Sequence, residues 1–162
     1  MSSSHATPRG QSDIPLCVYV DMVADLFHAG HVAFLRQARA LAAVLHPDRK
    51  VTLVVGIHSD ATAREYKRVP VCTMEERMAV VGAMDSVLKV IADAPLHLSQ
   101  DYLDTHKIDL VVHGDDLSET SKHMWYGCAV ERGIFHTVPY TGGISTTEIL
   151  DRIEIQKRTS VK

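Results

Sequence analysis

The sequence predicts an α/β protein with three layers, in which helices cover both faces of a mainly parallel sheet of about five strands. Segments rich in β-branched residues alternate with segments of helical apolar spacing along most of the chain, as in consecutive strand–helix–strand units. One of them, residues 51–57 (VTLVVGI), is a nearly unbroken apolar run, which is typical of a parallel strand buried on both faces. The two observations together indicate a parallel sheet enclosed by helices.

Length and composition fit one globular domain. The chain has 162 residues, 46% of them apolar, with 17 basic and 20 acidic side chains, so it is long enough to bury a sizeable core. The formal net charge of −3 gives no reason to expect binding to nucleic acid or to an anionic membrane. No apolar run approaches the roughly 18–20 residues of a membrane-spanning helix. We therefore expect a cytoplasmic protein without a membrane segment.

The cysteines agree with that location. There are three of them, Cys17, Cys72 and Cys128, and no CxxC pair, so neither a disulfide framework nor a zinc knot is indicated.

Residues 1–13 are mainly Ser, Thr, Gly, Pro and His, which predicts a mobile tail. We expect one domain over residues 14–158 and a short C-terminal tail over residues 159–162.

The first strand and the first helix flank a turn. Residues 17–20 are apolar, and Val23 follows soon after Asp21, which predicts a buried strand. From Gly30 onward apolar side chains recur every three or four residues, as in an amphipathic helix. This helix should end near Pro47, because proline cannot continue it.

The middle of the chain continues the alternation. After the strand at 51–57, residues 61–71 are rich in charge and weakly periodic, which indicates a short helix and an irregular loop. Thr73 and Glu76 fit a capping box, in which the two side chains satisfy free N–H groups at a helix start. That helix should end near Asp85.

The last part of the chain is predicted from the same patterns. We expect strands at 87–92, 108–113 and 134–138, and helices at 99–106 and 122–132. A loop over residues 139–144 leads to Ser145 and Glu148, which fit a second capping box at the start of a final helix, 146–157.

The turn His28-Ala29-Gly30-His31 is a candidate anion site. A strand that turns directly into a helix leaves the first helical N–H groups unpaired and the positive end of the helix dipole facing outward. Two imidazoles in that turn can both reach one phosphate. Two alternatives stay open on these residues alone: the pair could be metal ligands on one helix face, or one ring could be a core histidine bonded to a backbone carbonyl.

Two motifs carry a family resemblance. The turn at 28–31 resembles the HxGH signature of the nucleotidyltransferase superfamily, and residues 143–147 (GISTT) resemble the GIST segment of its cytidylyltransferase branch. Other residues of that branch, among them Lys67 and the HGDD run at 113–116, follow in the same order. The likeness is strongest to ethanolamine-phosphate and choline-phosphate cytidylyltransferases, with glycerol-3-phosphate cytidylyltransferase next, and it implies a Rossmann-like fold.

The resemblance implies transfer of the cytidylyl group of CTP to a phospho-alcohol in phospholipid synthesis, with release of pyrophosphate. His28 and His31 would donate to phosphate oxygens, and Lys67 would neutralise the α-phosphate and the incoming phosphate. Mg²⁺ is expected with CTP, keeping most of its waters and few protein ligands; no metal site made by protein residues is expected. The implied nucleotide-binding residues are Val23, Ala24, His28, Gly30, His31, His113, Gly114, Asp115, Tyr140, Gly143, Ile144, Ser145 and Thr146.

Asp21 bears on the second substrate. It interrupts an apolar strand, where a carboxylate is costly unless it has a partner, and the amine-alcohol enzymes of the family carry Asp there. A choline headgroup needs an aromatic cage, because a quaternary ammonium cannot donate a hydrogen bond. Leu96 stands where those enzymes have an aromatic residue, which leaves Tyr126 and Trp125. The implied substrate-binding residues are Asp21, Lys67 and Tyr126, and the implied substrate is ethanolamine phosphate.

The sequence also departs from the family pattern. Met22 and Ala24 replace a glycine and a phenylalanine, Arg68 replaces a glycine, Tyr140 replaces the arginine that opens the GIST segment, and Gly142 replaces an acidic or amide residue. A phenol lacks the charge of a guanidinium, and Arg68 is the candidate to compensate for it.

These departures motivate an alternative function, a catalytically silent regulatory or structural copy of the domain. Choline-phosphate and glycerol-3-phosphate cytidylyltransferases are alternative activities, and an ATP-dependent transferase is a further one that the GISTT match disfavours. By resemblance we expect a homodimer or one half of a two-domain enzyme.

Overall fold

The computed structural model describes residues 14–159. The tail predicted over residues 1–13 lies outside this range, and so do residues 160–162 of the predicted C-terminal tail. Within the described range, no helix combines the length and the apolar character needed to cross a bilayer.

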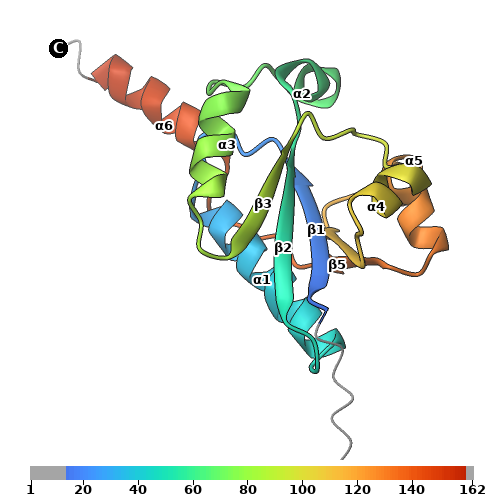
Figure 1. Cartoon of the computed structure of the whole chain (residues 1–162). Coiled ribbons are helices and arrows are strands. Elements are labelled where there is room, and N and C mark those ends of the chain that lie inside the picture. Colours follow the sequence, from blue (N-terminus) through green and yellow to red (C-terminus); the bar gives the residue numbers. More distant parts are fainter. Residues whose placement is uncertain (1–13, 160–162) are drawn as a thin grey trace, which may run out of the picture.

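A five-stranded sheet forms the middle layer, in the order β3-β2-β1-β4-β5 (Figure 1). Every neighbouring pair is parallel, and β1 is the central strand. The predicted α/β fold with a mainly parallel sheet is therefore confirmed. The strands are β1 (Leu16–Met22), β2 (Val51–Ile57), β3 (Val87–Ala92), β4 (Leu110–Gly114) and β5 (Phe135–Val138).

Helices cover both faces of the sheet, and each face has its own apolar core. Helices α1 (Ala29–Leu45) and α3 (Met74–Gly82) cover one face, and α4 (Gln100–Thr105) and α5 (Glu119–Glu131) cover the other (Figure 1). Successive residues of a strand point to opposite faces, so β1 supplies Val18 to the first core and Tyr19 to the second.

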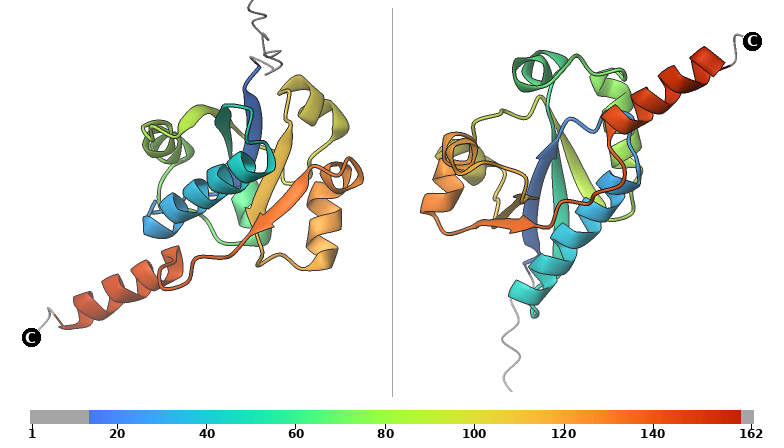
Figure 2. Two further views of the ribbon diagram at one scale, coloured as in Figure 1. Left: turned by 90° about the horizontal axis from the view of Figure 1, so that it is seen from below. Right: turned by 180° about the vertical axis from the view of Figure 1, so that it is seen from behind.

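Two helices lie outside these layers. Helix α2 (Asp60–Tyr66) follows β2, and α6 (Thr146–Thr159) ends the described chain. Figure 2 shows α6 extending away from the sheet, and none of its residues is buried.

Two helix ends differ from the sequence predictions, the start of α5 and the end of α3. Helix α5 begins at Glu119 and not near Lys122, because the Ser118 hydroxyl accepts the N–H of Ser121 at 3.1 Å and caps the helix earlier. Helix α3 ends at Gly82, before the expected Asp85.

The two predicted capping boxes have different outcomes. The first is complete: Thr73 accepts the N–H of Glu76 at 3.3 Å, and the Glu76 carboxylate accepts the N–H of Thr73 at 2.8 Å. At the second, the Ser145 hydroxyl accepts the N–H of Glu148 at 3.1 Å, which is one half of the predicted pair.

Candidate active site

A cavity of about 640 Å³ opens at the carboxyl ends of the strands. Ligands of open parallel sheets bind at this edge. The loops after β1, β2, β4 and β5 all contribute to it. It brings together most residues proposed from the sequence: Asp21, Val23, Ala24, His28, Gly30, His31, Lys67, His113, Gly114, Tyr126, Tyr140, Ile144, Ser145 and Thr146.

Two proposed residues, Asp115 and Gly143, are not among those that line the cavity. The Asp115 carboxylate accepts the backbone N–H of Tyr140 at 2.8 Å. Gly143 has a φ of +87°, a left-handed conformation that suits glycine, so its part is to turn the chain toward α6.

Backbone hydrogen bonds in the histidine turn fix which ring nitrogen of His28 and of His31 carries the proton. His28 is the N-cap of α1, and its Nδ1 accepts the N–H of Gly30 at 3.1 Å. Nδ1 of His31 accepts the N–H of His28 at 3.2 Å. An accepting Nδ1 carries no proton, so each neutral ring holds its proton on Nε2. The turn therefore offers two Nε2–H donors from rings that line the cavity.

The rings are neutral near pH 7. Burial, aided by His28 and Lys67, lowers the pKa of His31 from 6.5 to about 4. Burial also lowers the pKa of His28. In the free protein these groups act as hydrogen-bond donors without charge, and a polyanion bound beside them would raise both pKa values.

Gly30 lets three segments meet at this turn. A Cβ atom there would lie 2.9 Å from Cε1 of His28 and 3.3 Å from the carbonyl oxygen of Ile144. Only a residue without a side chain leaves room for both the capping ring and the segment that precedes α6. The loop between β1 and this turn has a strained backbone, because Ala24 and Leu26 have positive φ angles of 58° and 45°.

Asp25 connects the start of α6 to the loop after α2. The Thr146 hydroxyl donates to the backbone carbonyl of Asp25 at 2.9 Å. The Asp25 carboxylate accepts the N–H groups of Val71 and Cys72, both at 3.0 Å, and Nη2 of Arg68 at 3.1 Å. Burial alone would raise the pKa of Asp25, but these donors outweigh it and lower that pKa.

This loop brings two cations to the cavity. Lys67 and Arg68 both line it, and the Arg68 side chain keeps 40% of its surface exposed. Burial of the ammonium group lowers the pKa of Lys67, against the opposite effect of Asp116. The histidine turn, the start of α6 and these two cations form what we call the anion end of the cavity.

Arg77 holds the surrounding loops together from inside the protein. Its side chain is fully buried and pairs with Asp60 at 2.5 Å. It also donates to the backbone carbonyls of Cys72 at 3.1 Å and His58 at 3.0 Å, and to that of Val23. It thereby ties the loop after β1 to the loop that carries Lys67.

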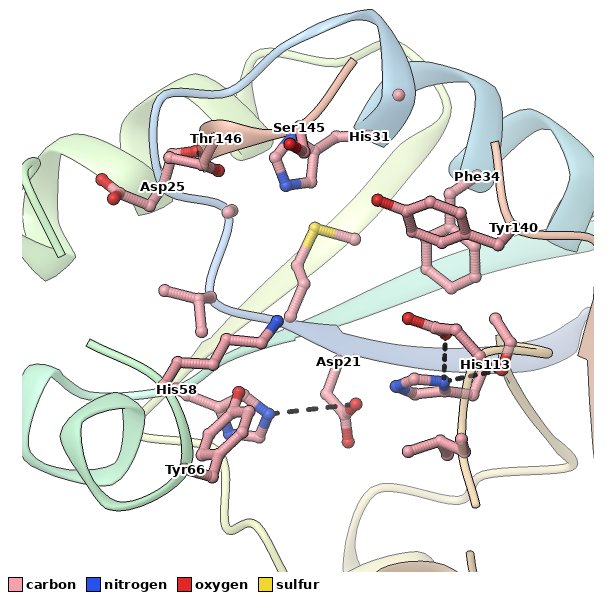
Figure 3. A pocket seen from close by; sticks show the side chains of 18 of the residues that line it. Asp21, Asp25, His31, Phe34, His58, Tyr66, His113, Tyr140, Ser145 and Thr146 are labelled. Atoms are coloured by element: carbon pink, nitrogen blue, oxygen red, sulfur yellow. Dashed lines mark hydrogen bonds and ion pairs between the residues drawn. The ribbon is translucent and has the colours of Figure 1, made fainter. Parts of the chain in front are cut away.

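Asp21 forms an acidic part of the cavity, which we call the cation end (Figure 3). Lys67 also reaches toward it, because its Nζ lies 5.5 Å from the centroid of the Tyr66 ring. Asp21 is only 5% exposed. Its Oδ1 accepts the Tyr126 hydroxyl at 2.6 Å, and Nε2 of His58 lies 3.9 Å from the same oxygen. Its Oδ2 is buried and has no hydrogen-bond partner among residues 14–159.

A kink in α5 places Tyr126 beside Asp21. Tyr126 leaves the helical conformation, with φ −122° and ψ 16°, and the carbonyl of Trp125 accepts the N–H of Leu98 at 2.8 Å. Burial and the nearby Asp21 raise the pKa of Tyr126 well above 10, so its hydroxyl stays a donor.

Two side chains at the cation end were not predicted from the sequence. His58 and Tyr66 both line the cavity and appear beside Asp21 in Figure 3. The Tyr66 ring lies 5.5 Å from that of Trp125 and 5.8 Å from that of His58. One signal was available for each: His58 follows β2 at the ligand edge, and Tyr66 immediately precedes Lys67.

Fold and cavity together define a class of protein, an α/β domain whose cavity at the strand ends is lined by the two histidines of the turn at 28–31 and by two cationic side chains. The family model for cytidylyltransferase-like proteins matches residues 22–152. The chain belongs to the cytidylyltransferase-like family.

Two relatives show which kinds of cytidylyltransferase this chain is similar to in sequence. An ethanolamine-phosphate cytidylyltransferase from Dictyostelium discoideum is 38% identical over 141 residues, covering 86% of this chain and 37% of that protein. Human choline-phosphate cytidylyltransferase A is 34% identical over 152 residues, covering 93% of this chain and 39% of that protein. This chain thus spans well under half the length of both relatives.

A solved structure supports the fold. The lipopolysaccharide core biosynthesis protein from Thermoplasma volcanium superposes with a TM-score of 0.59 at 21% identity, covering 80% of this chain and 98% of that one. At this identity the likeness concerns the fold alone.

Proposed function

We propose that this domain transfers the cytidylyl group of CTP to ethanolamine phosphate, giving CDP-ethanolamine and pyrophosphate. Membership of the cytidylyltransferase-like family supports the transfer, and the relatives named above act, by their names, on ethanolamine phosphate or choline phosphate.

One observation carries the choice of ethanolamine, the buried Oδ2 of Asp21 that lacks a hydrogen-bond partner among the described residues. A buried carboxylate oxygen without a donor is costly. A primary ammonium brings both an N–H donor and a positive charge, whereas a quaternary ammonium brings only the charge. Ethanolamine phosphate would therefore place its ammonium on Asp21 and its phosphate toward the anion end.

The proposed reaction is a direct in-line displacement. An oxygen of ethanolamine phosphate forms a bond to the α-phosphorus of CTP, the bond from that phosphorus to the bridging oxygen of the β-phosphate breaks, and pyrophosphate leaves with that bond's electron pair. Charge builds on the α-phosphate oxygens and on the leaving group. The Nε2–H groups of His28 and His31, the ammonium of Lys67 and the N–H groups at the start of α6 are fixed donors for that charge.

Mg²⁺ would enter with CTP and supply further neutralisation of the triphosphate. Within residues 14–159 no group of three or more His, Cys, Asp and Glu side chains is arranged to hold a metal ion. An Mg²⁺ ion that enters with a triphosphate is held chiefly by phosphate oxygens and water.

Choline phosphate is the second candidate. Trp125 was already a candidate cage residue from the sequence, and Tyr66, which was not, lies beside it with the two ring centroids 5.5 Å apart. Aromatic faces of this kind attract a quaternary ammonium.

The test is pyrophosphate release from CTP with ethanolamine phosphate, choline phosphate and glycerol 3-phosphate side by side. We expect the highest kcat/KM with ethanolamine phosphate. A higher value with either of the others would contradict the proposed substrate. Micromolar CTP binding without turnover would instead support a silent copy of the domain. The homodimer, or the partnership with a second domain, stays a prediction.

A further inference from the structure

His58 is a buried residue of the cavity that has no role in the chemistry described so far. It immediately follows β2, lines the cavity and is 2% exposed. Its N–H donates to the backbone carbonyl of Met22 at 3.1 Å, and its own carbonyl accepts Nη1 of the buried Arg77 at 3.0 Å. The backbone of His58 is therefore fixed on both sides by neighbouring elements.

The ring of His58 is fixed as well, and its contact determines where the proton lies. Nδ1 is 2.9 Å from the backbone carbonyl oxygen of Ala94. A carbonyl oxygen only accepts hydrogen bonds, so Nδ1 must carry the proton and donate it. In the neutral ring Nε2 then carries no proton and presents a lone pair. This tautomer is the opposite of the one that His28 and His31 adopt.

The Nε2 lone pair lies beside the carboxylate of Asp21. Nε2 is 3.9 Å from Oδ1 of Asp21, too far for a hydrogen bond, and a dashed line joins the two side chains in Figure 3. Oδ1 already accepts the Tyr126 hydroxyl, while Oδ2 is buried without a hydrogen-bond partner among residues 14–159. Buried acceptors without a donor are costly, so the pair is complementary to a ligand that brings more than one N–H.

The side chains around this pair leave both acceptors open. The Tyr66 ring packs edge-on against His58, with the ring centroids 5.8 Å apart, and offers no donor to Nε2. The Lys67 ammonium reaches toward the same place, 5.5 Å from the Tyr66 centroid, but within residues 14–159 it makes no hydrogen bond to Asp21 or His58. The donors that these acceptors need must therefore come from a ligand.

We propose that His58 is a specificity-determining residue, whose Nε2 accepts one N–H of the substrate ammonium while Asp21 accepts another. The inference rests on the proposed function for the identity of the substrate. A primary ammonium has three N–H donors, and each N-methyl group removes one until choline has none. Two acceptors need two N–H groups, so His58 determines how many methyl groups the headgroup can carry.

The test counts the acceptors with a series of substrates. KM and kcat for pyrophosphate release from CTP would be measured with the phosphates of ethanolamine, N-methylethanolamine, N,N-dimethylethanolamine and choline. In wild type we expect the first methyl group to be tolerated and the second to raise KM about tenfold, which corresponds to the loss of one charge-assisted hydrogen bond. The value of kcat should change little, because the headgroup does not react.

His58→Asn removes one acceptor and keeps the contact that fixes the ring. The Asn side-chain N–H can replace Nδ1 and donate to the carbonyl of Ala94, but nothing replaces Nε2. We expect KM for ethanolamine phosphate to rise about tenfold, and the second methyl group to have no further effect, since Asp21 alone needs only one N–H. The affinity for CTP and the melting temperature should stay near those of wild type.

His97→Asn is the matched control, because His97 is exposed and lies outside the cavity. It should keep the wild-type dependence of KM on methylation. The wild-type series is a test in its own right, whatever the stability of the variant. A first rise of KM at any step other than the second methyl group would contradict a site with two acceptors.

The outcomes separate the two proposals. Turnover by folded His58→Asn with the wild-type dependence on methylation would overturn the role of His58 alone. A lower KM in this variant would also overturn it, because the ring would then be protonated in the free protein and repel the ammonium. Calorimetric binding of ethanolamine phosphate that His58→Asn weakens, without pyrophosphate release, would support the role and overturn the proposed activity. A folded wild-type chain that binds none of the four phosphates would overturn both.

Discussion

His28 and His31 lie in one turn, where the backbone N–H groups of Gly30 and His28 fix the protonation of their rings. Asp21 instead depends on side chains that come from distant parts of the chain. Tyr126 reaches it from a kink in α5, and His58 from the end of β2. The histidine turn, which supplies two donors of the anion end, is thus a local structure, whereas the cation end is a single buried carboxylate assembled by the tertiary fold.

This difference predicts that substitutions at the two ends of the cavity lower different kinetic quantities. The donors of the anion end act on charge that develops in the transition state, so removing one should lower the rate of the chemical step. Asp21 acts on a group that does not react, so changing it should lower the affinity for one substrate and the discrimination between substrates.

The largest effect is expected for His31→Asn. The Asn oxygen can still accept the N–H of His28, but the Nε2–H donor is lost. We expect kcat for pyrophosphate release to fall about 10²- to 10³-fold, the loss measured when one preorganised oxyanion donor is removed elsewhere, while the melting temperature stays near that of wild type. His97→Ala is the control, since His97 is exposed and lies outside the cavity. A change confined to KM would contradict this role.

The next effect is expected for Asp21→Asn. The amide oxygen can keep the hydrogen bond from Tyr126, but the negative charge that attracts the ammonium is gone. We expect KM for ethanolamine phosphate to rise about 10- to 100-fold, the cost of losing one charge-assisted contact in a buried site, with the affinity for CTP unchanged. Steady-state kinetics on both substrates measure this, with the exposed Asp101→Asn as control. An equal loss of CTP affinity would show that Asp21 supports the whole site and not the headgroup.

The contrast also explains how much could be predicted from the sequence. The sheet and the histidine turn follow from local patterns, because alternating apolar segments and a strand–turn–helix need only neighbouring residues. Asp21 was identified because a carboxylate in an apolar strand needs a partner. The family resemblance placed Tyr126 in the same substrate site, but its hydrogen bond to Asp21 and the approach of His58 could not be predicted, since they depend on the kink in α5 and on the packing of β2. Asp115 was placed in the site by its motif, and only the structure shows its carboxylate bound to Tyr140.

The smallest effect is expected for Arg68→Ala, which tests whether the anion end has the redundancy that its several donors suggest. Nη2 of Arg68 is bonded to Asp25, so the guanidinium shares its charge between that carboxylate and the cavity, and its partial exposure weakens any contact with phosphate. We expect KM for CTP to rise about threefold to tenfold with kcat nearly unchanged, in the range of one partly solvated charge-assisted hydrogen bond. Arg64→Ala is the matched control, because Arg64 is an exposed cation of α2 that does not line the cavity. A fall in kcat as large as that of His31→Asn would mean that Arg68 acts on the transition state, and that the charge of this loop is as indispensable as the histidine turn.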